Sequence, residues 1–256
     1  MSKLPDDIKG DRDAILKEAE GLLSPSRRRL FGNILTLGGL SLATGVALHS
    51  YGNVKAMLTA ISRFNDGAQG LLFNENNLAP EYPASMITNP FPYNAFYPIK
   101  DIPSVDPATY TLKLSGQIAD KSPWTLEALR ALPQTTQITR HICVEGWSAI
   151  GKWGGVRFSD FLKRIGADIT CKYVGFRCAD NYYTSIDMPT ALHRQTLLTL
   201  TFRDHVLPNY YGFPMKLRMP TKLGYKNPKL ITEIFVTNVY PGGYWEDQGY
   251  NWFGGS

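Results

Sequence analysis

From residue 110 onward, apolar positions either alternate with polar ones over short stretches or recur at helical spacing. Alternation predicts strands, the first of which begins at Tyr110 and is closed by Gly116. Helical spacing predicts short helices, with Thr125 near the start of the first, Ser159 as the cap of the second and Gly166 as its stop. The predicted strands cover residues 110–116, 173–178, 197–203 and 229–239, and the predicted helices cover residues 125–132, 158–165 and 187–192. This pattern indicates one α+β domain without internal repeats.

The first 50 residues have a different pattern, which is typical of an export signal. A polar stretch over residues 1–26 leads into arginines at 27–29, and residues 30–54 then contain no Asp, Glu, Lys or Arg. Two arginines, one further residue and Phe31 resemble a twin-arginine signal, which exports folded proteins to the periplasm. The alternative is an uncleaved membrane anchor through residues 30–51, which are long enough to span a bilayer.

A connecting region, which we assign to residues 51–90, links this leader to a domain at 91–256. Apolar residues on one face of 55–64 predict a short amphipathic helix. Prolines are then so frequent between residues 79 and 107 that neither a helix nor a central strand runs through this stretch. We expect the stretch to wrap over the surface of the domain, fixed by the aromatic residues of 91–97; an extended linker is the alternative. The prolines are Pro80, Pro83, Pro90, Pro92, Pro98, Pro103 and Pro107.

The charge of the chain limits the ligands it is expected to bind, and its cysteine content limits the disulfides it can form. The 256-residue chain has a formal charge of +5 and a pI near 9.0, which permits an anionic ligand. Its basic residues are scattered apart from the arginines at 27–29, so nucleic-acid binding is not indicated. Three cysteines cannot all pair. A single strand over residues 171–178 would hold Cys171 and Cys178 roughly 20 Å apart, which is too far for a disulfide.

Cys143 is the cysteine whose surroundings suit chemistry. It lies in the run from Arg140 to Trp147, and a cation three residues upstream stabilises a thiolate, the form that binds soft metals. A buried core cysteine is the alternative. Within this run we expect His141 to point away from Cys143, while Arg140 and Val144 lie together, so that His141 is structural.

A second candidate site is the basic segment, which we define as residues 216–229. It has five cations within fourteen residues around a turn at Gly224. Backbone amides at such a turn, with lysines converging on it, bind a phosphate or another polyanion. The alternative is a basic loop that is merely solvated. The cations are Lys216, Arg218, Lys222, Lys226 and Lys229.

These motifs occur together in one family. The run at 140–147, the turn at 211–214, the loop at 220–229 and the tail at 240–250 jointly resemble the sulfite oxidase family of molybdopterin proteins. The resemblance covers residues 91–256. It is closest to the exported bacterial branch without a haem domain, which includes the catalytic subunit of periplasmic protein-methionine-sulfoxide reductase. It implies an α+β fold of mixed β-sheets with short peripheral helices, and one molybdenum–molybdopterin cofactor per chain without haem.

The resemblance also implies which residues contact the cofactor. Cys143 takes the position of the molybdenum ligand, and Arg140 is expected to stabilise its thiolate or to meet the negative charge of the cofactor. Cys178 stands where the reductase branch has a cofactor-contacting threonine. Tyr211 and Lys216 stand where sulfite oxidases have a histidine and an arginine. The remaining implied contacts are Asn94 and Tyr97 in the proline-rich segment, and Lys226, Asn227 and Lys229 in the loop that holds the pterin phosphate.

Two positions bear on the reaction. Sulfite oxidases have a catalytic tyrosine five residues after a tryptophan, as Tyr250 follows Trp245 here, and we expect Tyr250 to donate a hydrogen bond to the metal centre or to the substrate. Members of the family that oxidise sulfite also hold it with an arginine five residues after the metal cysteine, where this chain has Ser148. A pocket without guanidinium groups binds sulfite poorly, which favours a sulfoxide-type or other small substrate.

The sequence therefore predicts an exported molybdenum-dependent oxidoreductase that performs two-electron or oxygen-atom transfer. Without a haem segment, it exchanges electrons with a separate partner, such as a membrane cytochrome or a quinol-linked protein. One alternative is a sulfite dehydrogenase-like enzyme, and another is a non-catalytic protein that keeps the fold to bind an anion or a partner chain. Retention of Cys143 together with the basic segment argues against the non-catalytic alternative, because a binding module needs no metal thiolate.

Overall fold

Two β-sheets form the framework of the protein in the computed structural model, which describes residues 51–74 and 76–256. Residues 61–256 form one compact unit that contains both sheets, and residues 1–60 are assigned to a second unit. The predicted leader or membrane anchor in residues 1–50 lies outside the described residues. Within the described part, no helix has both the length and the apolar character needed to cross a bilayer.

The first sheet is mixed, with strands in the order β2, β1, β10, β5 and β6. Strands β1 and β10 are parallel, with Leu114 opposite Ile234, whereas the other pairs are antiparallel. Parallel strands need a crossover connection, and here it comprises most of the domain, including the second sheet. The strands are β1 (Thr111–Gly116), β2 (Trp124–Thr125), β5 (Tyr173–Cys178), β6 (Tyr183–Asp187) and β10 (Ile231–Thr237).

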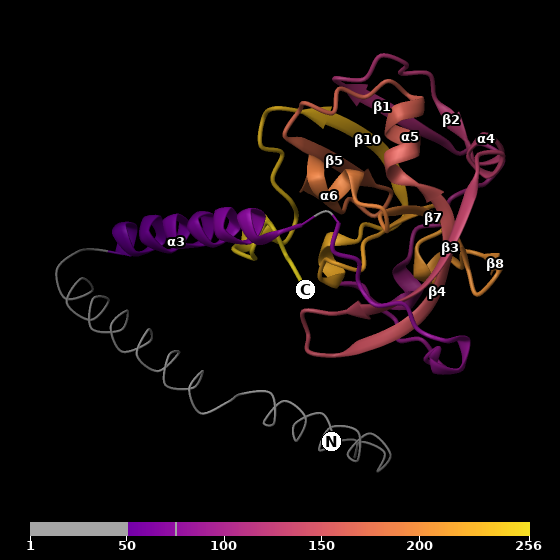
Figure 1. Cartoon of the computed structure of the whole chain (residues 1–256), viewed down its shortest axis with the longest axis horizontal. Coiled ribbons are helices and arrows are strands. Elements are labelled where there is room, and N and C mark those ends of the chain that lie inside the picture. The colour runs from indigo at the N-terminus through magenta and orange to yellow at the C-terminus, as the bar shows by residue number, and fades with distance from the viewer. Residues whose placement is uncertain (1–50, 75) are drawn as a thin grey trace, which may run out of the picture. The chain divides into compact units, whose positions relative to one another are not determined.

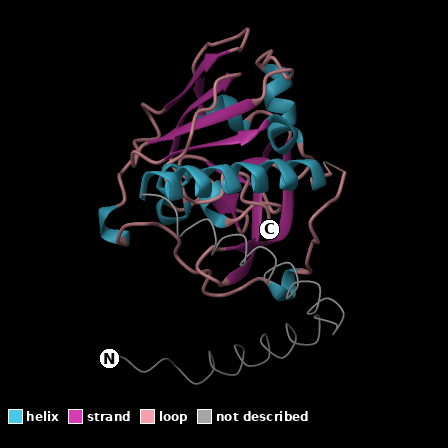
Figure 2. Cartoon of the chain, turned by 90° about the vertical axis from the view of Figure 1, so that its left-hand side faces the viewer, coloured by secondary structure: helices cyan, strands magenta, loops and turns pink. Residues whose placement is uncertain are grey.

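The second sheet is antiparallel, with strands in the order β3, β4, β7 and β8, and with β9 also paired to β7. Strands β3 and β4 form a long hairpin, which runs from Gln134 opposite Val156 to Ile142 opposite Ser148. The strands are β3 (Gln134–Ile142), β4 (Ser148–Arg157), β7 (Leu197–Phe202), β8 (His205–Val206) and β9 (Lys216–Arg218). The predicted α+β class with mixed sheets and short peripheral helices is confirmed (Figures 1 and 2).

Side-chain caps mark the start of two of the short helices. Thr125 accepts a hydrogen bond from Ala128 N at 3.1 Å to cap α4 (Leu126–Arg130), and Asp187 caps α6 (Met188–Leu192). The prediction that Ser159 caps α5 (Phe158–Arg164) is wrong, because the N-cap is Arg157, two residues earlier, and Ser159 lies inside the first turn. Helix α3 (Tyr51–Leu72) is longer than the predicted 55–64. The 3₁₀ turns are η1 (Ala84–Met86), η2 (Ile99–Asp101), η3 (Asn209–Tyr211), η4 (Gly224–Lys226) and η5 (Glu246–Gln248).

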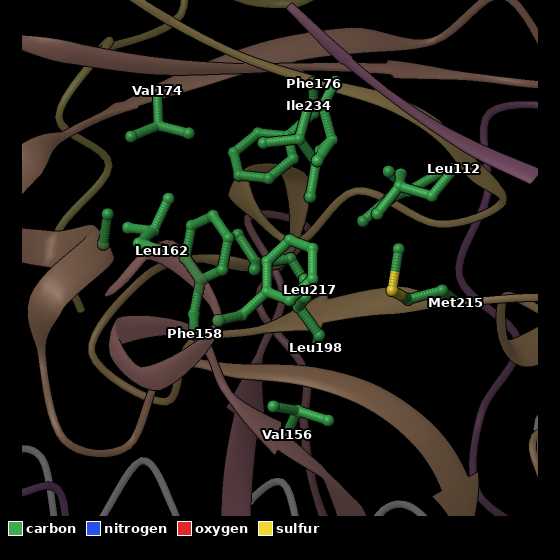
Figure 3. Close-up of a cluster of buried hydrophobic side chains, with 14 of the residues drawn as sticks. Leu112, Val156, Phe158, Leu162, Val174, Phe176, Leu198, Met215, Leu217 and Ile234 are labelled. Atoms are coloured by element: carbon green, nitrogen blue, oxygen red, sulfur yellow. The ribbon is translucent and has the colours of Figure 1, made fainter. Parts of the chain in front are cut away.

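The main hydrophobic core is built from both sheets and α5. Figure 3 shows side chains from these elements meeting in one cluster, among them Phe158, Phe176 and Leu217. All three are fully buried. Complete burial of such a side chain contributes roughly 1.5–3 kcal/mol, so this cluster fixes the framework that carries the loops.

The proline-rich segment wraps over the β3–β4 hairpin, as its aromatic residues predict. Phe91 is buried in a second, smaller cluster, where its ring packs edge-on against Trp153 and Phe202. Backbone bonds fasten the same segment, since Tyr82 N donates to Ile138 O at 3.0 Å. The segment is therefore part of the folded domain, and it delivers residues 94–97 to the end of the hairpin.

Candidate active site

Cys143 lies in the tight loop that joins β3 to β4. Its N–H donates to Trp147 O at 2.9 Å, and Gly146 N donates to Cys143 O at 3.2 Å. Gly146 has a φ of +90°, which residues other than glycine rarely adopt. The paired hairpin and this turn therefore hold the thiol at a fixed point just beyond the end of the sheet.

The thiol opens into a cleft at the protein surface, with about 700 Å³ of space between its walls including the part open to solvent. The cleft lies where the proline-rich segment, the β3–β4 loop, the basic segment and the C-terminal tail meet. Distant parts of the sequence thus converge on one place. The predicted site residues that line it are Asn94, Cys143, Asn227, Lys229 and Tyr250.

Asn94 and His141 stand beside the thiol. Asn94 Nδ2 lies 3.0 Å from His141 Nε2 and 3.9 Å from Cys143 Sγ. Burial, together with neighbouring cations, holds the pKa of His141 well below its usual value, so the imidazole is neutral. The prediction that His141 points away from Cys143 is wrong, because residues two apart in a strand share a face.

Glu145 brings a carboxylate close to Cys143. Its Oε2 lies 3.6 Å from Cys143 Sγ and accepts a hydrogen bond from Trp147 Nε1 at 3.0 Å. Burial raises the pKa of the Cys143 thiol, and the charge of Glu145 adds to this effect. A metal that binds at Cys143 therefore has to displace a proton from it.

The structure does not bring Arg140 to this thiol. Arg140 is exposed, its guanidinium carbon lies 5.3 Å from the centroid of the Tyr82 ring, and it lines a different hollow. Residues 140 and 143 are an odd number of positions apart, so an extended chain turns them to opposite sides. The predicted role of Arg140 at the thiolate is therefore corrected.

Three cations of the basic segment, Lys216, Arg218 and Lys229, converge on His141. Each of them contributes to its lowered pKa. Lys216 and Arg218 are buried and Lys229 is half-buried, yet none forms an ion pair with a carboxylate among the described residues. Burial lowers the pKa of Lys229 to about 8, and burial with the nearby cations lowers that of Lys216 well below its usual value. Buried cations without a counterion are unfavourable unless an anion joins them.

The other two lysines of the segment are already neutralised by the chain. Lys226 is fully buried, and its ammonium bonds to Glu246 Oε1 and, at 2.7 Å, to Ser185 O. Lys222 Nζ lies 3.5 Å from Asp187 Oδ2. Because the ammonium of Lys226 is occupied inside the protein, its placement does not support the predicted contact with a pterin phosphate.

Two predicted contacts act through their neighbours. Asn227 lines the cleft with part of its surface, but its Oδ1 accepts a hydrogen bond from Met219 N at 2.7 Å and so fixes the shape of the basic segment. Tyr97 Oη donates to Asp180 Oδ2 at 2.7 Å, and Asp180 lines the cleft. Tyr97 thus orients a cleft residue without lining the cleft itself.

Cys178 and Tyr211 lie behind the cleft. Cys178 is buried in the main hydrophobic core, where burial raises the pKa of its thiol well above the usual value. Tyr211 donates from its hydroxyl to Phe91 O at 2.5 Å and packs in the second cluster. Neither side chain lines the cleft, so direct contact with a cofactor is not supported for either residue.

Aromatic rings form one wall of the cleft. The ring of Tyr250 packs against that of Trp245 with centroids 5.0 Å apart, and against that of Tyr225 with centroids 5.7 Å apart. All three residues line the cleft, as does Phe96 from the proline-rich segment. The predicted pairing of Trp245 with Tyr250 is thus present as a packed pair.

The C-terminal tail, which we define as residues 249–256, holds this wall in place. Asp66 of α3 accepts hydrogen bonds from Asn251 Nδ2 at 2.6 Å and from Phe253 N at 2.9 Å. Lys222 of the basic segment donates to Phe253 O at 2.9 Å. The tail therefore links α3 to the basic segment and keeps Tyr250 at the cleft.

The residues present suit an anionic cofactor with a soft metal. His141 Nδ1 and Arg218 Nε are buried without a hydrogen-bond partner among the described residues. A β-carbon at Gly224 would lie 2.8 Å from His141 Nε2 and 2.9 Å from Asn94 Nδ2, so glycine keeps this corner open. The cysteine can supply a thiolate ligand to a soft metal, and the unpartnered nitrogens and unpaired cations suit a negatively charged organic group that carries the metal.

Comparison with known proteins identifies the class. Residues 99–245, which are more than half of the chain, match the family described as oxidoreductase molybdopterin binding domain. The chain belongs to this family and is a molybdopterin-dependent oxidoreductase of the sulfite oxidase type.

Its relatives narrow the class further. A putative protein-methionine-sulfoxide reductase subunit from Azospira oryzae is 61% identical over 250 residues, which cover 96% of this chain and 95% of the relative. A protein-methionine-sulfoxide reductase catalytic subunit from Burkholderia mallei is 27% identical over 256 residues, covering 89% of this chain and 74% of the relative. Among solved structures, the sulfane dehydrogenase SoxCD from Paracoccus pantotrophus aligns with a TM-score of 0.51 and 18% identity, over 54% of this chain and 40% of that chain. This last likeness concerns the fold alone.

The cleft also contains residues that sequence reasoning did not single out. Glu145, Asp180, Tyr182 and Tyr225 all line it. Glu145 had a usable signal, because it lies two residues after Cys143 in the same loop. Asp180 and Tyr182 had none, because they reach the cleft from the β5–β6 connection only once the first sheet has formed.

Proposed function

We propose that this oxidoreductase reduces methionine sulfoxide in proteins at a molybdenum ion bound by Cys143. The observation that carries the proposal is the lining of the cleft beside Cys143, which contains carboxylates and aromatic rings but no arginine among the described residues. The two relatives described above are both named as protein-methionine-sulfoxide reductase subunits, and this supports the same substrate class.

The cleft suits a neutral sulfoxide better than the sulfite anion. Glu145 and Asp180 both line it, and a carboxylate about 4 Å from an anion opposes its binding by roughly 1–4 kcal/mol, depending on the local dielectric. Phe96, Trp245 and Tyr250 offer ring surfaces to the sulfur and methyl groups of a methionine side chain. The carboxylates and the ring surfaces of the lining therefore both favour a sulfoxide, and the cation of the lining, Lys229, is assigned to the cofactor.

In this proposal the unpaired cations hold the cofactor. Lys229, which lines the cleft, would bind the negatively charged groups of one molybdopterin per chain, and Lys216 and Arg218, which are buried behind the lining, would add their positive charge. The approach of those groups raises the lowered pKa values of the lysines. Bound there, the cofactor supplies two-electron and oxygen-atom transfer. Cys143 would lose its thiol proton and serve as the protein ligand of the metal.

The aromatic wall and the loop complete the reaction site. Reduction of a sulfoxide to a thioether takes up two electrons and two protons and releases one water. Tyr250 is 38% exposed and lines the cleft, so its hydroxyl is available to donate a hydrogen bond to the sulfoxide oxygen. Asn94 Nδ2, held between His141 and Cys143, fixes the position of the loop next to the thiol.

We also propose where the enzyme works and how it obtains electrons. The arginines at 27–29 followed by Phe31 support export of the folded chain to the periplasm by the twin-arginine pathway. With one molybdenum cofactor and no haem, the chain receives electrons from a separate protein, such as a membrane cytochrome or a quinol-linked protein. The relatives' names as subunits support the existence of a partner chain.

A comparison of two cysteine variants tests the proposal. The protein, purified from its own export pathway, is assayed with a methionine-sulfoxide peptide and a reduced dye, and separately with sulfite and an oxidised dye. We expect peptide reduction with little sulfite oxidation, and a loss on the order of a thousandfold with loss of molybdenum in Cys143→Ser. Cys171→Ser is the matched control, because Cys171 is buried outside the cleft and bonded to Asn238. Faster turnover of sulfite than of the peptide, or normal molybdenum content in Cys143→Ser, contradicts the proposal.

A further inference from the structure

Helix α3 carries a stripe of large apolar side chains that the domain leaves exposed. Ile61, Phe64, Leu71 and Leu72 are 42%, 75%, 87% and 82% exposed. At about 100° per residue, their spacing places them along one face of the helix. Single exposed apolar residues are ordinary on a protein surface, but a contiguous set of this size marks an interaction surface.

The opposite face of this part of α3 is bound to the domain. Asp66 accepts the two hydrogen bonds from the C-terminal tail, and Gln69 Oε1 accepts a third from Gly255 N at 3.4 Å. Just past the helix, the ring of Phe73 packs edge-on against that of Phe253 with centroids 5.7 Å apart. Rotation of the helix to bury the stripe would break these contacts, so the stripe is held facing outward.

We propose that this apolar stripe lies on the surface of a lipid bilayer. Residues 30–54 contain no Asp, Glu, Lys or Arg, and this uncharged run ends in the first turn of α3. A chain whose apolar leader enters a bilayer therefore delivers α3 to the bilayer surface. Helices of this kind bury their apolar face at the boundary between headgroups and acyl chains.

Charge on the helix is consistent with a phospholipid surface. Between residues 61 and 72 the single acidic residue is Asp66, which is bound to the tail on the domain side. The single basic residue in that range is Arg63, which is exposed. The stripe itself therefore carries no carboxylate that would repel lipid phosphates, and the one exposed charge in this range is a cation.

A fluorescent label at one residue of the stripe tests this inference independently of catalysis. Phe64→Cys in the full chain is labelled with an environment-sensitive fluorophore, and vesicles of phosphatidylethanolamine and phosphatidylglycerol are added. The matched control is Val239→Cys, which is 76% exposed in the stretch after β10, and the unsubstituted chain with its buried cysteines gives the background. We expect the emission of the label at 64 to shift to shorter wavelengths with vesicles, and that of the label at 239 to stay unchanged.

Total binding to vesicles is not the deciding measurement, because a retained leader could hold the chain on a membrane by itself. In the chain labelled at residue 64, replacement of Leu71 and Leu72 by glutamine is expected to reduce the lipid-embedded fraction by on the order of tenfold for each leucine. A label at 64 that stays in water on vesicle-bound protein overturns the inference, as does an unchanged fraction in the glutamine variant. Shielding of the label before vesicles are added also overturns it: dependence on protein concentration then identifies a second copy as the occupant, and independence identifies the chain's own leader.

Discussion

The basic segment contains two kinds of buried lysine only a few residues apart. The ammonium of Lys226 bonds to Glu246 deep in the protein, and that of Lys222 lies 3.5 Å from Asp187. Lys216 is just as buried, but no carboxylate among the described residues pairs with it. The local sequence is equally basic at all three positions, so the difference arises from what the fold brings to each. A buried cation is structural where the chain supplies its anion, and where the chain supplies none we propose that the cation serves to hold a bound anion.

The largest effect is expected from breaking the internal pair. Lys226→Met leaves the carboxylate of Glu246 buried and unpaired, which costs about 3–5 kcal/mol of unfolding free energy and lowers Tm by roughly 10 °C for a chain of this size. Thermal unfolding followed by circular dichroism measures the change. The double variant Lys226→Met with Glu246→Gln should recover much of the loss, because Glu246 also accepts a hydrogen bond from Thr184 that glutamine can keep. An unchanged Tm in the single variant would remove the distinction between the two kinds of lysine.

Replacement of the unpaired Lys216 should change the unfolding free energy in the opposite direction. Lys216→Met removes a buried amine whose charged form has no counterion, so the cofactor-free protein should become more stable by about 1–2 kcal/mol. The same variant should bind less molybdenum when it is purified from the export pathway. Denaturant unfolding and metal analysis of one preparation measure both quantities. If Lys216→Met destabilises the cofactor-free chain as much as Lys226→Met does, the two lysines are of one kind and the comparison fails.

Lys229 provides a test that depends on pH. Burial lowers its pKa from 10.5 to about 8, so between these values the unfolded chain binds more protons than the folded one, and the stability of the cofactor-free protein rises with pH. An anion binds the protonated form, and inorganic phosphate should therefore raise Tm by a few degrees below pH 8, with the gain shrinking as pH rises through 8. Thermal scans with and without phosphate across this range measure the gain. Lys229→Met is the control that should show little gain at any pH, and a gain independent of pH would argue against Lys229 as an anion ligand.

The smallest effect should come from an ion pair outside the segment. Lys152 Nζ lies 2.5 Å from Asp204 Oδ2, but the Asp204 side chain is 66% exposed. Exposed pairs of this kind contribute about 0–1 kcal/mol, and asparagine tolerates the φ of +66° at this position. Asp204→Asn should therefore change unfolding free energy by less than about 1 kcal/mol in denaturant titrations. A loss as large as that of Lys226→Met would show that burial does not explain the comparison.

Sequence patterns predicted the fold where one face of an element is apolar and its ends are marked. The strand predicted at 173–178 has the same bounds as β5. The predicted helix start at Thr125 is also correct, because Thr125 caps α4. Strand β4 escaped prediction because glycines interrupt its apolar pattern. A close contact with another strand requires glycine there, since a β-carbon at Gly155 would lie 2.0 Å from Leu198 O of β7. A pattern that depends on a distant neighbour is invisible in the local sequence.

In the candidate site, too, residues with a signal in their own stretch of sequence are predicted correctly, and those that depend on distant contacts are not. Cys143 stood out because its own loop carries the signal, and Lys229 and Tyr250 were found through motifs that occur together. Arg140 was assigned to the thiol because a nearby charge in sequence was taken for a nearby charge in space. The basic loop assigns Lys226 to a phosphate, and the sequence does not reveal that Glu246, from another part of the chain, already binds its ammonium. Pairing of charges is a tertiary property, so a local run of basic residues does not reveal which of them are free.

The C-terminal tail has a consequence for the order in which the enzyme can be made. The chain leaves the ribosome from its N-terminus, so the hairpin loop with Cys143 emerges long before Tyr250 and the residues that bond to Asp66. Strand β10, which pairs in parallel with β1, is also a late arrival. Until both have emerged, the cysteine stands at the end of an incomplete cleft that lacks Trp245 and Tyr250 of its aromatic wall. We therefore expect the cofactor to be loaded after translation, because a stalled nascent chain would present the cysteine in a cleft that is still incomplete.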